Sequence, residues 1–102
     1  MEEKIVKLLE QYEDFIMRYT LGDFKDEEGK RYTRVYKYEW EDHKQDIAYT
    51  LNKLINSKIN INSIGLAYII ITEWSGVMTF SDGDLDIKAL EEVCKEMLVQ
   101  LL

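Results

Sequence analysis

Both ends of the chain carry apolar side chains at spacings of three and four residues, which limits how these segments can fold. The first series is Ile5, Leu8, Tyr12, Phe15 and Tyr19, and the last is Ile87, Leu90, Cys94, Met97 and Leu101. Apolar residues at this spacing share one face of an α-helix. The sequence therefore predicts amphipathic helices over 2–20 and 86–101. Asp84 or Asp86 is placed to cap the second helix by accepting from its free N–H groups.

The middle of the chain fits both helix and strand. Residues 42–57 predict a third helix, because their apolar side chains share a helical face and Asp42 with Gln45 resembles a capping box. Residues 31–40 are rich in aromatic and β-branched side chains, which favours a strand. The same segment also places Tyr32, Tyr36 and Trp40 at helical spacing, so a helix remains open there.

Residues 66–81 have the pattern of a hairpin. Strongly β-forming residues at 68–74 lead into Ser75 and Gly76, which suit a tight turn, and 77–80 return. A helix through 64–74 competes with this interpretation. The favoured fold is a single α+β domain over 1–102. In it a small antiparallel sheet, made of hairpin 66–81 and strand 31–40, is covered by helices 2–20, 42–57 and 86–101. The alternative is an all-α bundle with a long helix over 31–57.

Charge limits the kinds of partner. Twenty acidic and 13 basic residues give a net charge of −7. This charge disfavours binding to nucleic-acid phosphates and to anionic lipid. One segment, 30–38, does interleave basic with aromatic residues, a pattern that can bind single-stranded nucleic acid. The net charge favours association with a basic protein. The longest strongly apolar run, 65–71, is far shorter than the roughly 20 residues of a membrane span. With one cysteine and no signal-peptide pattern, we expect a cytoplasmic protein.

Groups suited to catalysis are few. The sequence contains no Gly-rich phosphate loop and no nucleophile elbow. His43 is the only histidine, and it has acidic neighbours but no evident nucleophile. Cys94 lies within an apolar stripe, where Glu91, Glu92 and Glu96 would oppose formation of a thiolate. We therefore expect neither enzymatic activity nor a cofactor.

One short run could bind a cation. Asp82, Asp84 and Asp86 occupy alternate positions, as do the first ligands of an EF-hand loop. The rest of that pattern fails, because Ile87 stands where its glycine is expected and Val93 where its glutamate is expected. A polar turn that caps the last helix explains the same residues, and it is the preferred interpretation.

Aromatic content points towards a docking surface. Seven tyrosines and two tryptophans are a high load for 102 residues, and such side chains are enriched at binding hot spots. The predicted partner-binding residues are Tyr32, Tyr36, Tyr38, Trp40, Trp74, Asp26, Glu27, Glu28, Glu41 and Asp42. In this hypothesis the carboxylates stand in for phosphates and steer association, while the rings anchor the partner.

These features together predict a small acidic, non-catalytic protein-binding module. An inhibitor or immunity protein, or an anti-defence protein of viral or mobile-element origin, would fit this description. Its partner would be a basic protein that handles nucleic acid. The first alternative is a homo-oligomeric assembly protein, such as a homodimer joined through the apolar stripes of the terminal helices. The second is a small metal-binding protein that uses the acidic loop 82–86.

Overall fold

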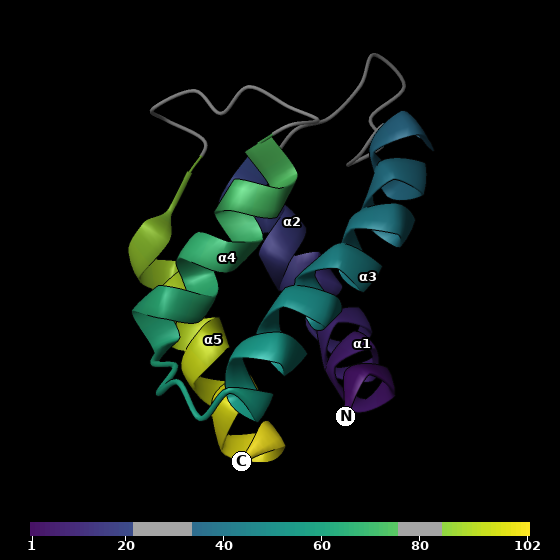
Figure 1. The fold of residues 1–102 in the computed structure, drawn as a ribbon. Coiled ribbons are helices and arrows are strands. Elements are labelled where there is room, and N and C mark those ends of the chain that lie inside the picture. Colours follow the sequence, from purple (N-terminus) through teal and green to yellow (C-terminus); the bar gives the residue numbers. More distant parts are fainter. Residues whose placement is uncertain (22–33, 76–84) are drawn as a thin grey trace.

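The computed structural model describes residues 1–21, 34–75 and 85–102, and all regular secondary structure in these ranges is helical (Figure 1). Its elements are α1 (Glu2–Gln11), α2 (Glu13–Leu21), α3 (Arg34–Asn56), α4 (Ser63–Ser75) and α5 (Ile87–Leu101). For residues 21, 34–38, 74 and 75 the backbone alone is described. The predicted α+β fold is therefore wrong. The all-α alternative agrees with the described ranges, where α3 takes up most of the expected long helix.

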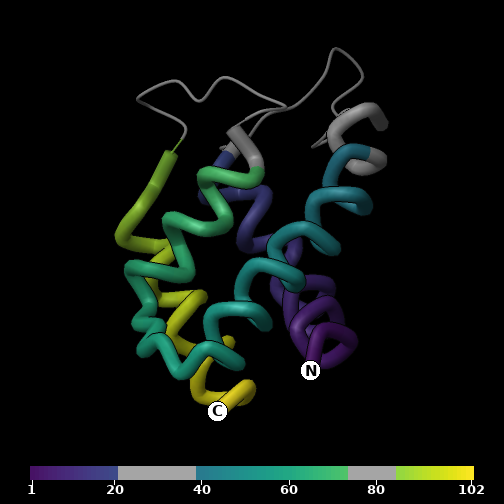
Figure 2. Tube along the Cα trace, viewed as in Figure 1, coloured from purple at the N-terminus to yellow at the C-terminus, as the bar shows by residue number. Residues whose placement is uncertain are grey.

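The helices pack side by side around one apolar core. α4 lies against α3 and α5, α1 lies against α3 and α5, and α2 packs on α5. Figure 2 shows the two chain ends near each other at one end of the bundle. Every described helix contributes to the core, whose least exposed large side chains include Ile5, Leu9, Ile16, Trp40, Ile47, Leu51, Leu66, Ile70, Leu90 and Met97. None of the described helices has both the length and the apolar character required to cross a membrane.

The predicted helix 2–20 is divided into two at Tyr12. Tyr12 has φ −106° and ψ 10°, away from regular helical values, although its N–H still donates to the Leu8 carbonyl at 3.1 Å. Before this break the core side is formed by Ile5, Leu8 and Leu9; after it, by Ile16, Met17 and Thr20. The break therefore shifts the buried face around the helix axis. Of the predicted stripe residues beyond it, Phe15 is exposed and Tyr19 is partly buried against the core.

The strand expected at 31–40 is also wrong wherever the structure describes it, because Arg34–Trp40 form the first turns of α3. Among the described side chains of this helix, the buried ones are Trp40, Lys44, Ile47, Ala48 and Leu51. These spacings of three and four are helical. Burial against α1 and α4 thus outweighs the local β preference of the aromatic residues. The capping box expected at Asp42 and Gln45 is also wrong, because both residues lie inside α3 and not at its first turn.

The first half of the predicted hairpin 66–81 is helical, since Ser63–Ser75 form α4, while residues 76–81 lie outside the described ranges. Leu66, Ala67 and Ile70 are buried, whereas Tyr68 is 54% exposed. In a strand Leu66, Tyr68 and Ile70 would share one face, so this burial pattern is helical. The β-branched run is tolerated because α4 packs against both α3 and α5, and burial of its apolar side chains there outweighs the local β preference.

Local signals explain three of the helix ends. Lys58 has φ 59°, and the N–H groups of Lys58 and Ile59 donate to the carbonyls of Ile55 and Leu54, which is a Schellman motif that ends α3. Asn62 starts α4 by accepting from the Gly65 N–H through Oδ1 at 2.8 Å. Asp86 starts α5 as predicted, since its Oδ1 accepts from the Ala89 N–H at 3.1 Å.

Candidate functional site

A shallow apolar groove lies between α2 and α5. Its volume is about 360 Å³, and it is lined by Phe15, Tyr19, Ala89, Val93, Glu92 and Glu96. The Phe15 ring is 44% exposed and stacks on the Tyr19 ring, with 6.3 Å between ring centroids and 27° between ring planes. The backbone fixes one end of the groove, because the Asp86 N–H donates to the Tyr19 carbonyl at 2.8 Å. We refer to this surface as the α2–α5 groove.

The charged side chains of the α2–α5 groove are both carboxylates. Glu92 and Glu96 are exposed and follow one another at i and i+4 on α5. Lys95 Nζ lies 3.3 Å from Glu92 Oε1, and both side chains are largely in solvent, where such a pair is worth little. The groove therefore combines an apolar floor with an acidic rim.

Sequence reasoning assigned Phe15 and Tyr19 to the apolar stripe of the first helix and did not single them out as surface residues. Beyond the break at Tyr12, Phe15 is 44% exposed, whereas Tyr19 is partly buried against the core and lines the groove. The sequence does contain a signal for this arrangement, because Ile16 and Met17 form a second apolar face that can be buried in place of Phe15 and Tyr19. No propensity fixes which of the two faces would turn towards the core.

Two predicted partner-binding residues form part of a charge cluster at the junction of α1, α2 and α3. Trp40 is 2% exposed and donates from Nε1 to Glu13 Oε1 at 3.0 Å, which places its ring in the core and not on a docking surface. Glu41 is exposed and lies 2.9 Å from Lys44 Nζ. A further predicted residue, Asp42, is also exposed and follows Glu41 in α3, but among the described residues it makes no contact that places it in this cluster.

Lys44 organises this cluster. Its side chain is only 2% exposed, and its Nζ also lies 3.3 Å from Glu10 and 3.8 Å from Glu13. Burial of the ammonium opposes its charge, but hydrogen bonds and charge attraction from Glu41 and Glu10 outweigh burial and raise the pKa of Lys44. Next to it is an acidic hollow of about 270 Å³, lined by Glu2, Glu3, Val6, Lys7, Glu10 and Gln45.

Several predicted residues cannot be placed on a surface. Tyr32, Asp26, Glu27, Glu28, Asp82 and Asp84 lie outside the described ranges. Tyr36 and Tyr38 belong to α3 and Trp74 to α4, and for these three the backbone alone is described. Asp86 serves as the N-terminal cap of α5, which is the role that the preferred interpretation of this loop gave it.

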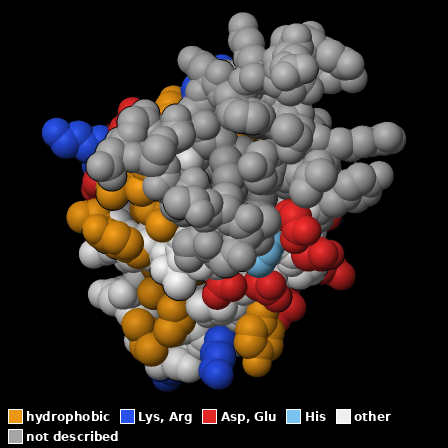
Figure 3. All heavy atoms as spheres, turned by 90° about the horizontal axis from the view of Figure 1, so that it is seen from above, with side chains coloured by type: hydrophobic (Ala, Val, Ile, Leu, Met, Phe, Trp, Pro, Cys, Tyr) orange, Lys and Arg blue, Asp and Glu red, His pale blue; other side chains and the backbone are white. Residues whose placement is uncertain are grey.

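His43 lies close to two carboxylates, Asp46 and Glu73, a group that was not predicted from the sequence. Its Nδ1 lies 3.8 Å from Asp46 Oδ2 on the same helix, and a ligand atom of Glu73 on α4 completes a group within 4.8 Å. Asp46 is one of the acidic residues near His43 in the sequence, but Glu73 lies within the segment expected to form a hairpin. Figure 3 shows the histidine beside several Asp and Glu side chains.

Cys94 is fully buried in the core and is a free thiol. Burial, with a smaller contribution from the charge of Glu91, raises the pKa of this thiol to about 12. A thiol of this kind is a poor nucleophile and a poor metal ligand at neutral pH. Cys94 therefore acts as a small apolar side chain in the packing of α5.

Comparison of the chain with protein-family models, with curated proteins and with solved structures finds no match.

Proposed function

We propose that this chain is a non-catalytic protein-binding module that receives a basic, amphipathic segment of its partner in the α2–α5 groove. The observation that carries the proposal is the pairing of an aromatic floor, formed by the exposed Phe15 and the partly buried Tyr19, with the carboxylates of Glu92 and Glu96. Aromatic anchors supply affinity at such surfaces, and complementary charge supplies specificity and a faster association rate.

The size of the groove agrees with a protein ligand. A volume of about 360 Å³ lies at the lower end of the range of roughly 300–1,000 Å³ for small-molecule pockets. Such a groove suits one or two apolar side chains presented by a helix, as in helix-in-groove recognition. The partner's basic residues would then lie against the two glutamates of the rim.

The net charge of −7 supports a basic partner. A protein that handles nucleic acid is the expected class, because such proteins carry basic surfaces that an acidic module could occupy. The module would then act as an inhibitor or an immunity or anti-defence protein. The proposal keeps the cytoplasmic location expected from the sequence.

A pair of designed peptides tests the proposal. One is an amphipathic helix with leucines on one face and lysines on the other, and its counterpart carries glutamates in place of the lysines. Fluorescence anisotropy should show binding of the lysine peptide only, weakening as salt is raised. Phe15→Ser should weaken it about tenfold, which corresponds to about 1.4 kcal/mol. Tyr49→Ser is the matched control, because Tyr49 is 59% exposed on α3 and does not line the groove.

A second pair of variants isolates the acidic rim. Glu92→Gln with Glu96→Gln should weaken binding and flatten its salt dependence. Glu2→Gln with Glu3→Gln removes the same charge from the start of α1 and should have little effect. Equal binding of both peptides, or a Phe15→Ser variant that binds like the unmodified chain, would reject the proposal. Self-association that is lost in Phe15→Ser, seen by analytical ultracentrifugation, would instead assign the groove to a second copy of the chain.

A further inference from the structure

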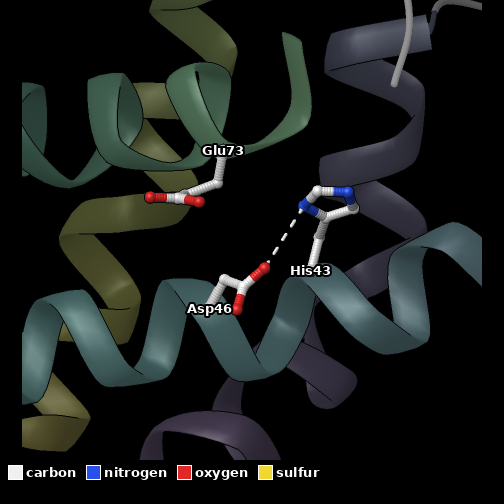
Figure 4. Close-up of side chains that lie close together, drawn as sticks. All are labelled: His43, Asp46 and Glu73. Atoms are coloured by element: carbon white, nitrogen blue, oxygen red, sulfur yellow. Dashed lines mark ion pairs between the residues drawn. The ribbon is translucent and has the colours of Figure 1, made fainter. Parts of the chain in front are cut away.

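Three side chains that can bind a metal ion meet between α3 and α4. His43 and Asp46 come from successive turns of α3, and Glu73 comes from the last turns of α4 (Figure 4). One ligand atom from each lies within 4.8 Å of the other two. Residues 27 or more positions apart in sequence are thus brought to one point by the packing of α4 on α3.

The distances suit a shared cation better than a direct contact. Nδ1 of His43 and Oδ2 of Asp46 are 3.8 Å apart, which is longer than a hydrogen bond of 2.7–3.2 Å. Two ligands that each lie about 2.1 Å from one ion are separated by about 3.0–3.5 Å. Small side-chain rotations would therefore close the group around an ion. Asp46 is free to make such a rotation, because its side chain is 61% exposed.

The histidine supplies the fixed part of the group. The side chain of His43 is 19% exposed, and its Nδ1 is shielded from solvent. This nitrogen faces the side where the two carboxylates are found (Figure 4). A shielded nitrogen that faces the exposed carboxylate of Asp46 and the carboxylate of Glu73 is suited to binding a metal, because the Asp46 carboxylate can close on an ion that the imidazole holds in place.

The chemistry of the three ligands selects the class of ion. Imidazole nitrogen suits Zn²⁺, Mn²⁺, Co²⁺ and related first-row ions, whereas Ca²⁺ is held by oxygen ligands alone. Two carboxylates also balance the charge of a divalent ion. Three protein ligands leave further coordination positions for water.

We propose that His43, Asp46 and Glu73 form a binding site for a divalent first-row transition-metal ion that links α3 to α4. The site is separate from the α2–α5 groove, and it does not depend on the function proposed for that groove. Binding of the ion joins two helices that otherwise meet through apolar packing, so the folded state is stabilised by mass action.

Thermal unfolding of the whole chain, with Zn²⁺ or Mn²⁺ as the probe, tests the site. At a free ion concentration about 100 times Kd, the melting temperature should rise by about 13 °C. His43→Gln and Glu73→Gln should each abolish the rise and the heat of binding in calorimetry. Asp42→Asn should leave both unchanged, because Asp42 is an exposed carboxylate next to His43 but outside the group.

A spectroscopic readout separates this site from adventitious binding. Co²⁺ bound through His43 should give a visible absorption spectrum that is lost in His43→Gln and retained in Asp42→Asn. Circular dichroism of both variants checks that they remain helical. The proposal is overturned if His43→Gln and Glu73→Gln bind Zn²⁺ as tightly as the unmodified chain, or if neither Zn²⁺ nor Mn²⁺ raises the melting temperature.

Discussion

Substitution of Lys44 separates two contributions that this side chain makes to stability, its charge and its buried stem. The side chain is 2% exposed, while its partners Glu10 and Glu41 are 50% and 65% exposed. Lys44→Met keeps an unbranched apolar stem of similar length and removes the charge. Lys44→Ala removes both. Comparison of the two variants therefore measures the stem alone.

The expected magnitudes follow from the burial of each part. The pairs formed by Lys44 involve half-exposed carboxylates, so each contributes less than about 1 kcal/mol, and burial of the ammonium offsets part of that gain. Lys44→Met should cost about 1 kcal/mol. Lys44→Ala also loses three buried methylene-sized groups at about 0.8 kcal/mol each, so it should cost about 3 kcal/mol. For a domain of this size, these losses lower the melting temperature by about 5 and 15 °C.

Urea unfolding followed by circular dichroism at neutral pH gives both values directly. Equal destabilisation by Lys44→Met and Lys44→Ala would refute the reasoning, because the charge would then account for the whole effect. Alkaline pH provides a second check. Because the folded-state pKa of Lys44 is raised, its charge contributes fully below the unfolded-state pKa, and that contribution is lost as the pH rises through the folded-state pKa. The gap between the unmodified chain and Lys44→Met should therefore narrow above about pH 10.5.

Two further predictions concern a helix end and the core thiol. Lys58→Gly should raise the free energy of unfolding by roughly 0.5–1 kcal/mol, because φ 59° strains a residue that has a Cβ. The control is Lys53→Gly within α3, which should lower the free energy of unfolding by about 1 kcal/mol in the same urea experiment. At pH 8 the Cys94 thiol should hardly react with a thiol-specific chromogenic reagent until urea unfolds the chain, since its pKa is raised to about 12; rapid labelling of the folded chain would contradict this burial.

The C-terminal helix α5 was predictable because its local and tertiary signals agree. Leu90, Cys94 and Met97 repeat at helical spacing, and they are among the residues that α5 buries. Asp86 caps this helix through a side-chain contact only three residues away in sequence, which makes it readable from the chain alone. The function predicted from charge and aromatic content stays a prediction.

The middle of the chain could not be predicted in the same way. The apolar run 68–71 favours a strand locally, and packing of α4 against both α3 and α5 outweighs that preference. Both candidate sites depend on such placement. Phe15 reaches the surface through the break at Tyr12, and Glu73 meets His43 only once α4 is packed on α3. Sequence periodicity describes each helix by itself, so it predicts neither the exposure of Phe15 nor the contact between Glu73 and His43.

The hydrogen bond from Asp86 to the Tyr19 carbonyl makes one backbone amide a reporter for the α2–α5 groove. Tyr19 lines the groove with its ring and holds the start of α5 with its carbonyl, so both functions belong to one residue. A ligand that fixes the ring restrains the carbonyl as well. Occupancy of the groove would therefore slow exchange of the Asp86 amide with deuterium, at a position that is not itself part of the groove lining.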